Sequence, residues 1–307
     1  WLQKYDSLSF ALPVTKDPWH KKCVDHSADA MRLLLSAGKN NGFWSHRVWS
    51  VALECWQYGR VGIEAWKVFA EKKVDLPEDL IRGLITKISW WLKSVAKEAE
   101  EPLLNLAEYC DDILRQIPDA DANDGVYCDE EGMPYQCLAE AILRVWYGTQ
   151  PQKGGLIADP YVRILTAVAD GKTKAYRCAR KELLSHITDF YIVDPEWTKS
   201  HLVPLLSWKE LGKDALDAWA HAIMMPRYDA GFLTLIKDDF IKVADYFSAF
   251  DGVRQNWFAA LIASMLEGIV GALNQADIPD TKENIEKYCK PFFATNFKMK
   301  DVKNSKI

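Results

Sequence analysis

Apolar residues recur along most of this chain at intervals of three and four, which is the period of one face of an α-helix. The segment 173–191 gathers its apolar side chains in this way and predicts one amphipathic helix. Similar stripes occupy 80–95 and 216–223, whereas the alternating pattern of β-strands is almost absent. We expect an all-α fold of about 12 to 14 helices, arranged as an irregular HEAT-like α-solenoid stack of antiparallel helix pairs.

Aspartate–proline pairs predict three helix starts. Asp17, Asp159 and Asp194 each precede a proline. A carboxylate at this position accepts hydrogen bonds from free backbone N–H groups, and proline at the first helical position lacks an N–H that would be unpaired anyway. Four glycines are placed where helices should end: Gly38, Gly59, Gly148 and Gly171.

The longest predicted connection divides the chain in two. We expect an N-terminal helical subdomain at 1–117, an acidic connecting loop at 118–133, a C-terminal helical-repeat subdomain at 134–290 and a basic tail at 291–307. No sequence period repeats along the chain, so the helical-repeat prediction rests on the succession of helix pairs.

The composition is that of a folded protein, since 49% of the 307 residues are hydrophobic. No charged and then apolar leader precedes Asp17, so no secretory signal is predicted, and the start at Trp1 suggests a fragment of a longer polypeptide. The seven cysteines follow no metal-ligand spacing, as expected in a reducing compartment. We therefore expect a cytoplasmic protein.

The charge is unevenly distributed. Residues 97–140 hold 13 acidic side chains against two basic ones, a local charge of −11, which leaves +6 elsewhere from a total of −5. No stripe of basic and aromatic residues is present, so we expect no nucleic-acid partner. The window 256–276 is long enough to span a bilayer, but it carries Glu267 near its centre and predicts a buried core helix instead.

Two segments partly resemble metal sites. Asp119, Asp121, Asn123 and Glu130 have the spacing of calcium ligands, but Asp124 stands where such a loop needs glycine, so a solvated acidic loop is the more common explanation.

His20, Cys23 and His26 carry zinc-binding groups within seven residues. His26 would point away from the other two on a helix, and no fourth ligand has a recognisable spacing. We expect no metal in this chain.

Catalytic motifs are not evident in the sequence. We find no nucleophile elbow, phosphate-binding loop or dinucleotide-binding glycine fingerprint, so we expect a chain without catalytic residues or a bound cofactor.

Thirteen tryptophans suggest packing and binding roles. Trp91, Trp146 and Trp219 lie on apolar stripes and are expected in the core. Trp90 lies about 150° from the centre of its helix's apolar face. Cover by a neighbouring helix is the more common solution for such a ring, and contact with a partner is the alternative.

One stretch resembles a known family. Asp194-Pro195-Glu196-Trp197 and the residues up to Trp208, followed by Ala218-Trp219 and Met225-Pro226-Arg227, are similar to the helical C-terminal region of bacterial defence-associated sirtuins. The resemblance covers about 159–266, and the first 130 residues do not follow the family pattern.

The resemblance implies a sensor or scaffold. An upstream sirtuin-like domain, not part of this chain, would hydrolyse NAD when a phage structural or assembly protein binds the helical region. Most matching residues are of architectural types, and Arg227 is the one that could also contact a partner, although helix carbonyls are its more common neighbours. The alternative is a helical-repeat scaffold that holds a homo-oligomer together and senses nothing.

Overall fold

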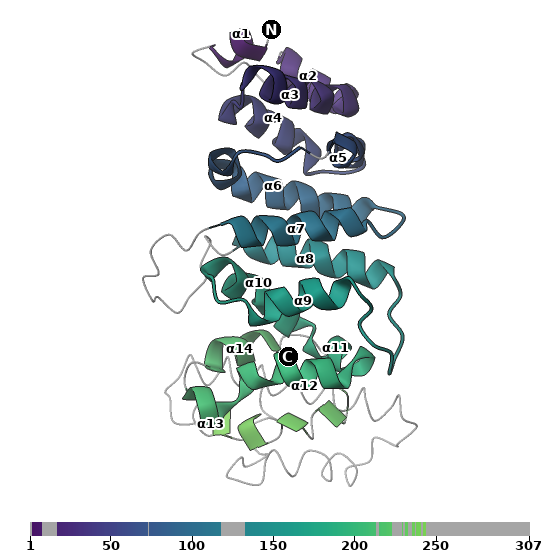
Figure 1. Cartoon of the computed structure of the whole chain (residues 1–307), viewed down its shortest axis with the longest axis vertical. Coiled ribbons are helices and arrows are strands. Elements are labelled where there is room, and N and C mark those ends of the chain that lie inside the picture. The colour runs from purple at the N-terminus through teal and green to yellow at the C-terminus, as the bar shows by residue number, and fades with distance from the viewer. Residues whose placement is uncertain are drawn as a thin grey trace, which may run out of the picture. The chain divides into compact units, whose positions relative to one another are not determined.

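The computed structural model describes residues 2–7, 17–72, 74–117, 133–212 and 215–222, and the positions 229, 231–232, 235–236, 238–240 and 242–243. Every regular element within these residues is a helix, which confirms the all-α class (Figure 1). The chain forms two compact units. The first comprises 1–151 and 158–182, and the second comprises 152–157 and 183–307.

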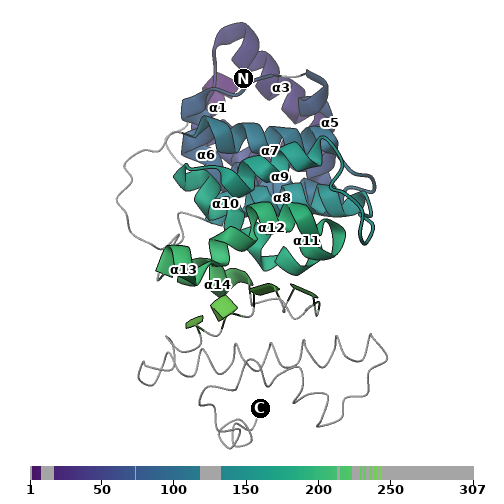
Figure 2. The same ribbon diagram turned by 60° about the horizontal axis from the view of Figure 1, so that its bottom comes forward.

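The first unit is a stack of helices in two layers. Its helices are α1 (Leu2–Asp6), α2 (Pro18–Asp25), α3 (Ser27–Asn41), α4 (His46–Trp56), α5 (Val61–Lys72), α6 (Glu78–Glu98), α7 (Leu104–Gln116), α8 (Met133–Gly148), α9 (Tyr161–Asp170) and most of α10 (Lys174–Ser185). Helices α2, α4, α6 and α8 pack in succession and form one layer (Figure 1). Helix α3 packs on α5, and α7 packs on α9, in the other layer (Figure 2). Consecutive helices join the layers, as the prediction of stacked helix pairs requires.

The predicted division at 118–133 lies inside this unit. Helices α6 and α7 precede that segment in the sequence, and both pack against α8, which follows it. The division into compact units falls instead within α10 and around residues 152–157. A long connection therefore does not separate the packed helices on its two sides.

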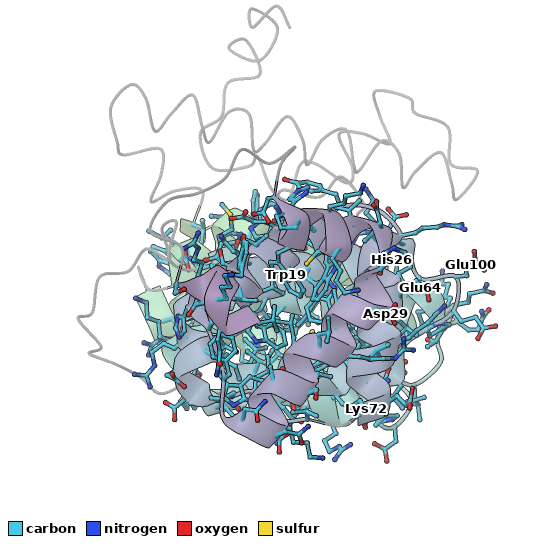
Figure 3. The ribbon with its side chains drawn as sticks, turned by 90° about the horizontal axis from the view of Figure 1, so that it is seen from above. Trp19, His26, Asp29, Glu64, Lys72 and Glu100 are labelled. Atoms are coloured by element: carbon cyan, nitrogen blue, oxygen red, sulfur yellow. The ribbon has the colours of Figure 1, made fainter. Side chains whose placement is uncertain are left out.

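Tryptophans fill the space between the helices of the first unit. Seen from above, Trp19 lies in the interior, whereas Glu64, Lys72 and Glu100 extend from the margin (Figure 3). Trp19 and Trp56 connect α2 and α4, since their indole N–H groups donate to Val48 O at 2.9 Å and Cys23 O at 3.0 Å, respectively.

An aromatic cluster continues this core between α4, α5, α6 and α7. Its members lie with ring centroids 5.0 to 6.0 Å apart: Trp56, Trp66, Phe69, Trp91 and Tyr109. Trp91 Nε1 also donates to Gly62 O at 3.1 Å. Such pairs add about 0.5–1.5 kcal/mol each to the free energy of simple burial. Trp91, Trp146 and Trp219 are all at most 1% exposed, as predicted.

The part of the second unit that the structure describes up to residue 222 consists of short helices. They are α11 (Ile187–Val193), α12 (Pro195–His201), a 3-10 helix (Val203–Leu206), α13 (Trp208–Leu211) and α14 (Ala215–Ala222). Helix α12 packs on α11 and on the 3-10 helix, which also contacts α14. Trp219 Nε1 donates to Leu206 O at 2.8 Å and so ties α14 to the 3-10 helix.

The prediction of one continuous helix at 173–191 is wrong. The segment forms α10 and α11, with a break at His186, where φ is −112° and ψ is 15°. Leu183 and Ile187 on the two sides of the break are both at most 1% exposed. The apolar spacing is preserved across the break, so the periodicity alone could not reveal it.

Two of the three predicted aspartate caps are confirmed. Asp17 Oδ1 accepts from Trp19 N and His20 N at 2.8 and 3.1 Å. Asp194 accepts from Trp197 N at 3.0 Å at the start of α12. Asp159 does not cap a helix, because the residue at the cap position of α9 is Pro160, which has no side-chain acceptor.

The prediction that a helix ends at Gly38 is wrong. Helix α3 continues to Asn41 and ends at Gly42, which adopts the left-handed φ of 63°. A Cβ at Gly38 would lie 2.4 Å from Trp44 Cζ2, so this glycine allows an indole to approach the helix closely. The predictions at Gly59, Gly148 and Gly171 agree with helix ends at or near these residues.

We expect the substitution Asp194→Ala to lower the free energy of unfolding by about 2 kcal/mol. The carboxylate is 6% exposed and also accepts from Ile157 N at 3.1 Å, so its removal leaves two backbone donors unpaired. Urea unfolding would measure the loss. The control Glu196→Ala, at an exposed site in the same helix, should change stability by less than about 0.5 kcal/mol. Equal effects of the two substitutions would contradict this role.

Candidate functional site

Trp90 lies on the outer stripe of α6. Its exposed neighbours along the helix include Arg82 and Thr86, eight and four residues before it, and Lys97, seven residues after it. The indole is 37% exposed, whereas Trp91 beside it is fully buried. The stack therefore covers Trp90 only in part, and it is the one exposed tryptophan among the described residues.

A cation stacks on this ring. Lys93 Nζ lies 5.1 Å from the centroid of the Trp90 ring, one helical turn further along α6. At this distance the ring attracts the ammonium group by about 0.5–1 kcal/mol. Trp90 is thus a large and accessible aromatic side chain with a cation against its ring.

Lys93 also connects α6 to α8. Its Nζ lies 2.6 Å from Glu140 Oε2. The other carboxylate oxygen, Oε1, accepts from Arg144 Nε at 2.9 Å and from Arg144 Nη2 at 2.6 Å. Two cations share one carboxylate, which leaves one positive charge beside Trp90.

The electrostatics favour the ionised form of Glu140. Partial burial disfavours the carboxylate, but hydrogen bonds from Lys93 and Arg144, together with their positive charges, outweigh burial and lower its pKa. Glu140 is therefore ionised at neutral pH.

A second bridge connects α6 to α4. Lys87 contacts the hydroxyl of Ser50 and the carboxylate of Glu54, both on α4. Lys87 and Lys93 stand three residues before and after Trp90. We call Lys87, Trp90, Lys93, Glu140 and Arg144 the Trp90 surface, which extends over α6 and α8 and is tied to α4.

The Trp90 surface has the chemistry of a binding site. Tryptophan and arginine are enriched among the residues that contribute most to protein interfaces. The bridges on both sides fix the side chains before a partner arrives, which reduces the entropy lost on binding. The surplus positive charge suits a partner with acidic groups.

The other candidate residues lie apart from this surface or outside the described residues. Arg227, and the calcium-like residues Asp119, Asp121, Asn123 and Glu130, all fall outside them. Among the described residues, no group of three or more potential ligands could hold a metal ion. The membrane-length window 256–276 is likewise not described, and no described helix is both long and apolar enough to cross a bilayer.

His20, Cys23 and His26 do not form one site. His26 is exposed at the junction of α2 and α3, whereas the Cys23 thiol is buried and hydrogen bonds with the thiol of Cys55. Among the cysteines that the structure describes, the free thiols are Cys23, Cys55, Cys110 and Cys137. Cys178 is disulfide-bonded, which a reducing compartment does not predict.

The described residues on which the expected family resemblance rests have structural roles. Asp194 caps α12 and Pro195 is its first residue. Trp197 is 6% exposed and packs on Phe190, with ring centroids 5.1 Å apart. Trp219 is buried, and Trp208 N donates to Asp239 Oδ1 at 3.0 Å. None of these described contacts identifies a ligand.

The sequence did not reveal the bridge between Lys93 and Glu140. These residues are 47 positions apart and separated by the connection at 118–132. The only local signal is the spacing of Glu140 and Arg144, which is that of an ion pair on one helix face. Helical periodicity located Trp90 correctly on the outer side of α6 but gave no information on its neighbours from α8.

A scan against models of protein families and searches of curated proteins and of solved structures gave no match to this chain.

We expect Glu140→Gln to lower the free energy of unfolding at pH 7 by about 1 kcal/mol, because Lys93 and Arg144 lose their shared anion. A carboxylate with a lowered pKa stabilises the fold above the ordinary glutamate pKa of about 4.3, and this contribution is lost as the pH falls through the folded-state value. The difference between the variant and the unmodified chain should therefore shrink below about pH 4.

Urea unfolding at pH 7 and at about pH 3.5 would measure both differences. The matched control is Glu64→Gln, which removes an exposed ion pair with Lys67 within α5 and should change stability by less than about 0.5 kcal/mol. A loss for Glu140→Gln that is the same at both pH values would contradict the proposed charge network.

Proposed function

We propose that this chain is a non-catalytic recognition region of a bacterial anti-phage defence protein. It binds a phage structural or assembly protein and controls an upstream sirtuin-like domain that hydrolyses NAD. The defence context rests on the resemblance of about 159–266 to defence-associated sirtuins. A cytoplasmic location follows from the same proposal, because phage proteins assemble there.

The partly exposed Trp90 is the observation that carries the recognition role. Most described tryptophans are buried in the stack, and Trp90 alone is exposed, on the outer stripe of α6. Tryptophan is among the residue types that contribute most to the affinity of protein interfaces. All residues of the Trp90 surface precede 159–266, so the recognition role does not rest on that stretch.

The helical stack supports transmission of a binding event. Each helix of the first unit contacts a few neighbours, and the Trp90 surface includes side chains from α6 and α8 while Lys87 reaches α4. A partner that binds one arrangement of these helices more tightly than another shifts the population towards it. The altered arrangement would then change the contact with the upstream catalytic domain.

The chain used as bait in lysate of phage-infected cells is expected to retain a phage structural or assembly protein. Binding of that purified protein should weaken at least about tenfold for Trp90→Ala, because the substitution removes the central aromatic contact. Calorimetric titration would measure the dissociation constant. The matched control Tyr58→Ala removes another exposed ring, at a site 73% exposed, and should leave the affinity unchanged.

Stability measurements separate recognition from folding. Trp90→Ala should lower the free energy of unfolding by less than about 1.5 kcal/mol, whereas Trp91→Ala should lower it by about 3–5 kcal/mol. A large loss of stability for Trp90→Ala would assign Trp90 to the core and remove the proposal. Sedimentation that shows self-association through Trp90, with no phage protein retained, would favour the oligomerisation scaffold instead.

The isolated chain is expected to release no nicotinamide from NAD, because the proposed hydrolytic residues belong to the upstream domain. Chromatography of the reaction mixture would measure nicotinamide, with heat-denatured chain as the control. Turnover that depends on the folded chain would overturn the non-catalytic assignment.

A further inference from the structure

Two thiols meet where α2 packs on α4. Cys23 is fully buried on α2, and Cys55 is half-buried on α4. The two thiols form a side-chain hydrogen bond. Cys55 Sγ also lies 3.9 Å from His20 O, on the helical turn of α2 that leads to Cys23.

Indole hydrogen bonds fix the register of these two helices. Trp56 Nε1 donates to Cys23 O at 3.0 Å, and Trp56 follows Cys55 directly in the sequence. Trp19 Nε1 donates in the opposite direction, to Val48 O on α4 at 2.9 Å. These contacts hold Cys55 opposite Cys23, so the meeting of the two sulfurs does not depend on one flexible side chain.

The environment gives the two cysteines different reactivity. The hydrogen bond from Cys23 stabilises the Cys55 thiolate and lowers the pKa of Cys55, in spite of its partial burial and the nearby carboxylates of Glu54 and Asp17. Burial, followed by the hydrogen bond with Cys55, raises the pKa of Cys23. Cys55 is thus the accessible nucleophile and Cys23 is a protonated neighbour that oxidants cannot reach.

We propose that Cys23 and Cys55 are a reversible oxidation site, in which hydrogen peroxide oxidises Cys55 and Cys23 then closes a disulfide between α2 and α4. The Cys55 thiolate attacks one peroxide oxygen, the O–O bond breaks, and a sulfenic acid and hydroxide form. The Cys23 sulfur displaces hydroxide from the sulfenic sulfur and forms the S–S bond. Both thiol protons end in water, so two thiols and one peroxide give one disulfide and two waters.

The disulfide would join the first two helices of the even-numbered layer. It would restrict the unfolded chain and oppose separation of α2 from α4. A dithiol would restore both thiols by exchange. This inference does not depend on the proposed phage-recognition role, since it concerns only the packing of α2 and α4.

Peroxide treatment followed by non-reducing peptide mapping tests this proposal. We expect a cross-linked peptide pair that contains Cys23 and Cys55, and its loss after treatment with a dithiol. Oxidation should raise the melting temperature by about 5 °C. Mapping distinguishes this bond from the existing disulfide at Cys178, because each cysteine lies in its own peptide.

Variants identify the roles of the two sulfurs. Cys55→Ser should abolish both the cross-link and the oxidation-dependent rise in melting temperature. The matched control Cys137→Ser removes another free thiol, on α8, and should retain both effects. Peroxide that leaves Cys23 and Cys55 unlinked, or that converts Cys55 only to sulfinic or sulfonic acid, would overturn the proposal. If Cys55→Ser does not fold, the peptide map of the unmodified chain decides alone.

Discussion

Indole N–H groups that donate to the backbone of a neighbouring element fix how the helices pack. A buried tryptophan contributes a large apolar area, and its N–H usually has an acceptor inside the protein, although Trp49 and Trp66 bury theirs without one. Trp19, Trp56, Trp91 and Trp219 each donate to a backbone carbonyl of another element. Since the carbonyls of a helix are already at fixed heights along its axis, each such bond also sets how far one helix is shifted along its neighbour.

The two adjacent tryptophans of α6 differ in their surroundings. Trp91 donates its indole N–H to Gly62 O and packs against aromatic side chains, so its burial is favourable. Trp90 points to the other side, where Lys93 covers one part of its ring and solvent reaches the rest. The same residue type therefore serves architecture at one position and presents an accessible surface at the next.

Sequence periodicity predicted the features that depend on a single helix and missed the contacts that form between two helices. It gave the all-α class, the burial of Trp91 and the outward position of Trp90, because each follows from 100° per residue on a single helix. It missed the bridge from Lys93 to Glu140 and the meeting of Cys23 with Cys55, because neither follows from spacing within a helix. Gly38 was misassigned for the same reason, since the indole that needs its missing side chain belongs to the loop after α3.

The layered arrangement of the first unit has a consequence for how it forms and opens. Because the even-numbered helices touch mainly the next even-numbered helix and the helices adjacent in sequence, most stabilising contacts span short stretches of chain. In topologies of this kind, folding nucleates quickly and spreads from one helix pair to the next. Helix pairs at an end of the stack have fewer neighbours than those in the middle. Local unfolding should therefore begin at α2 and α3 while the aromatic cluster stays folded.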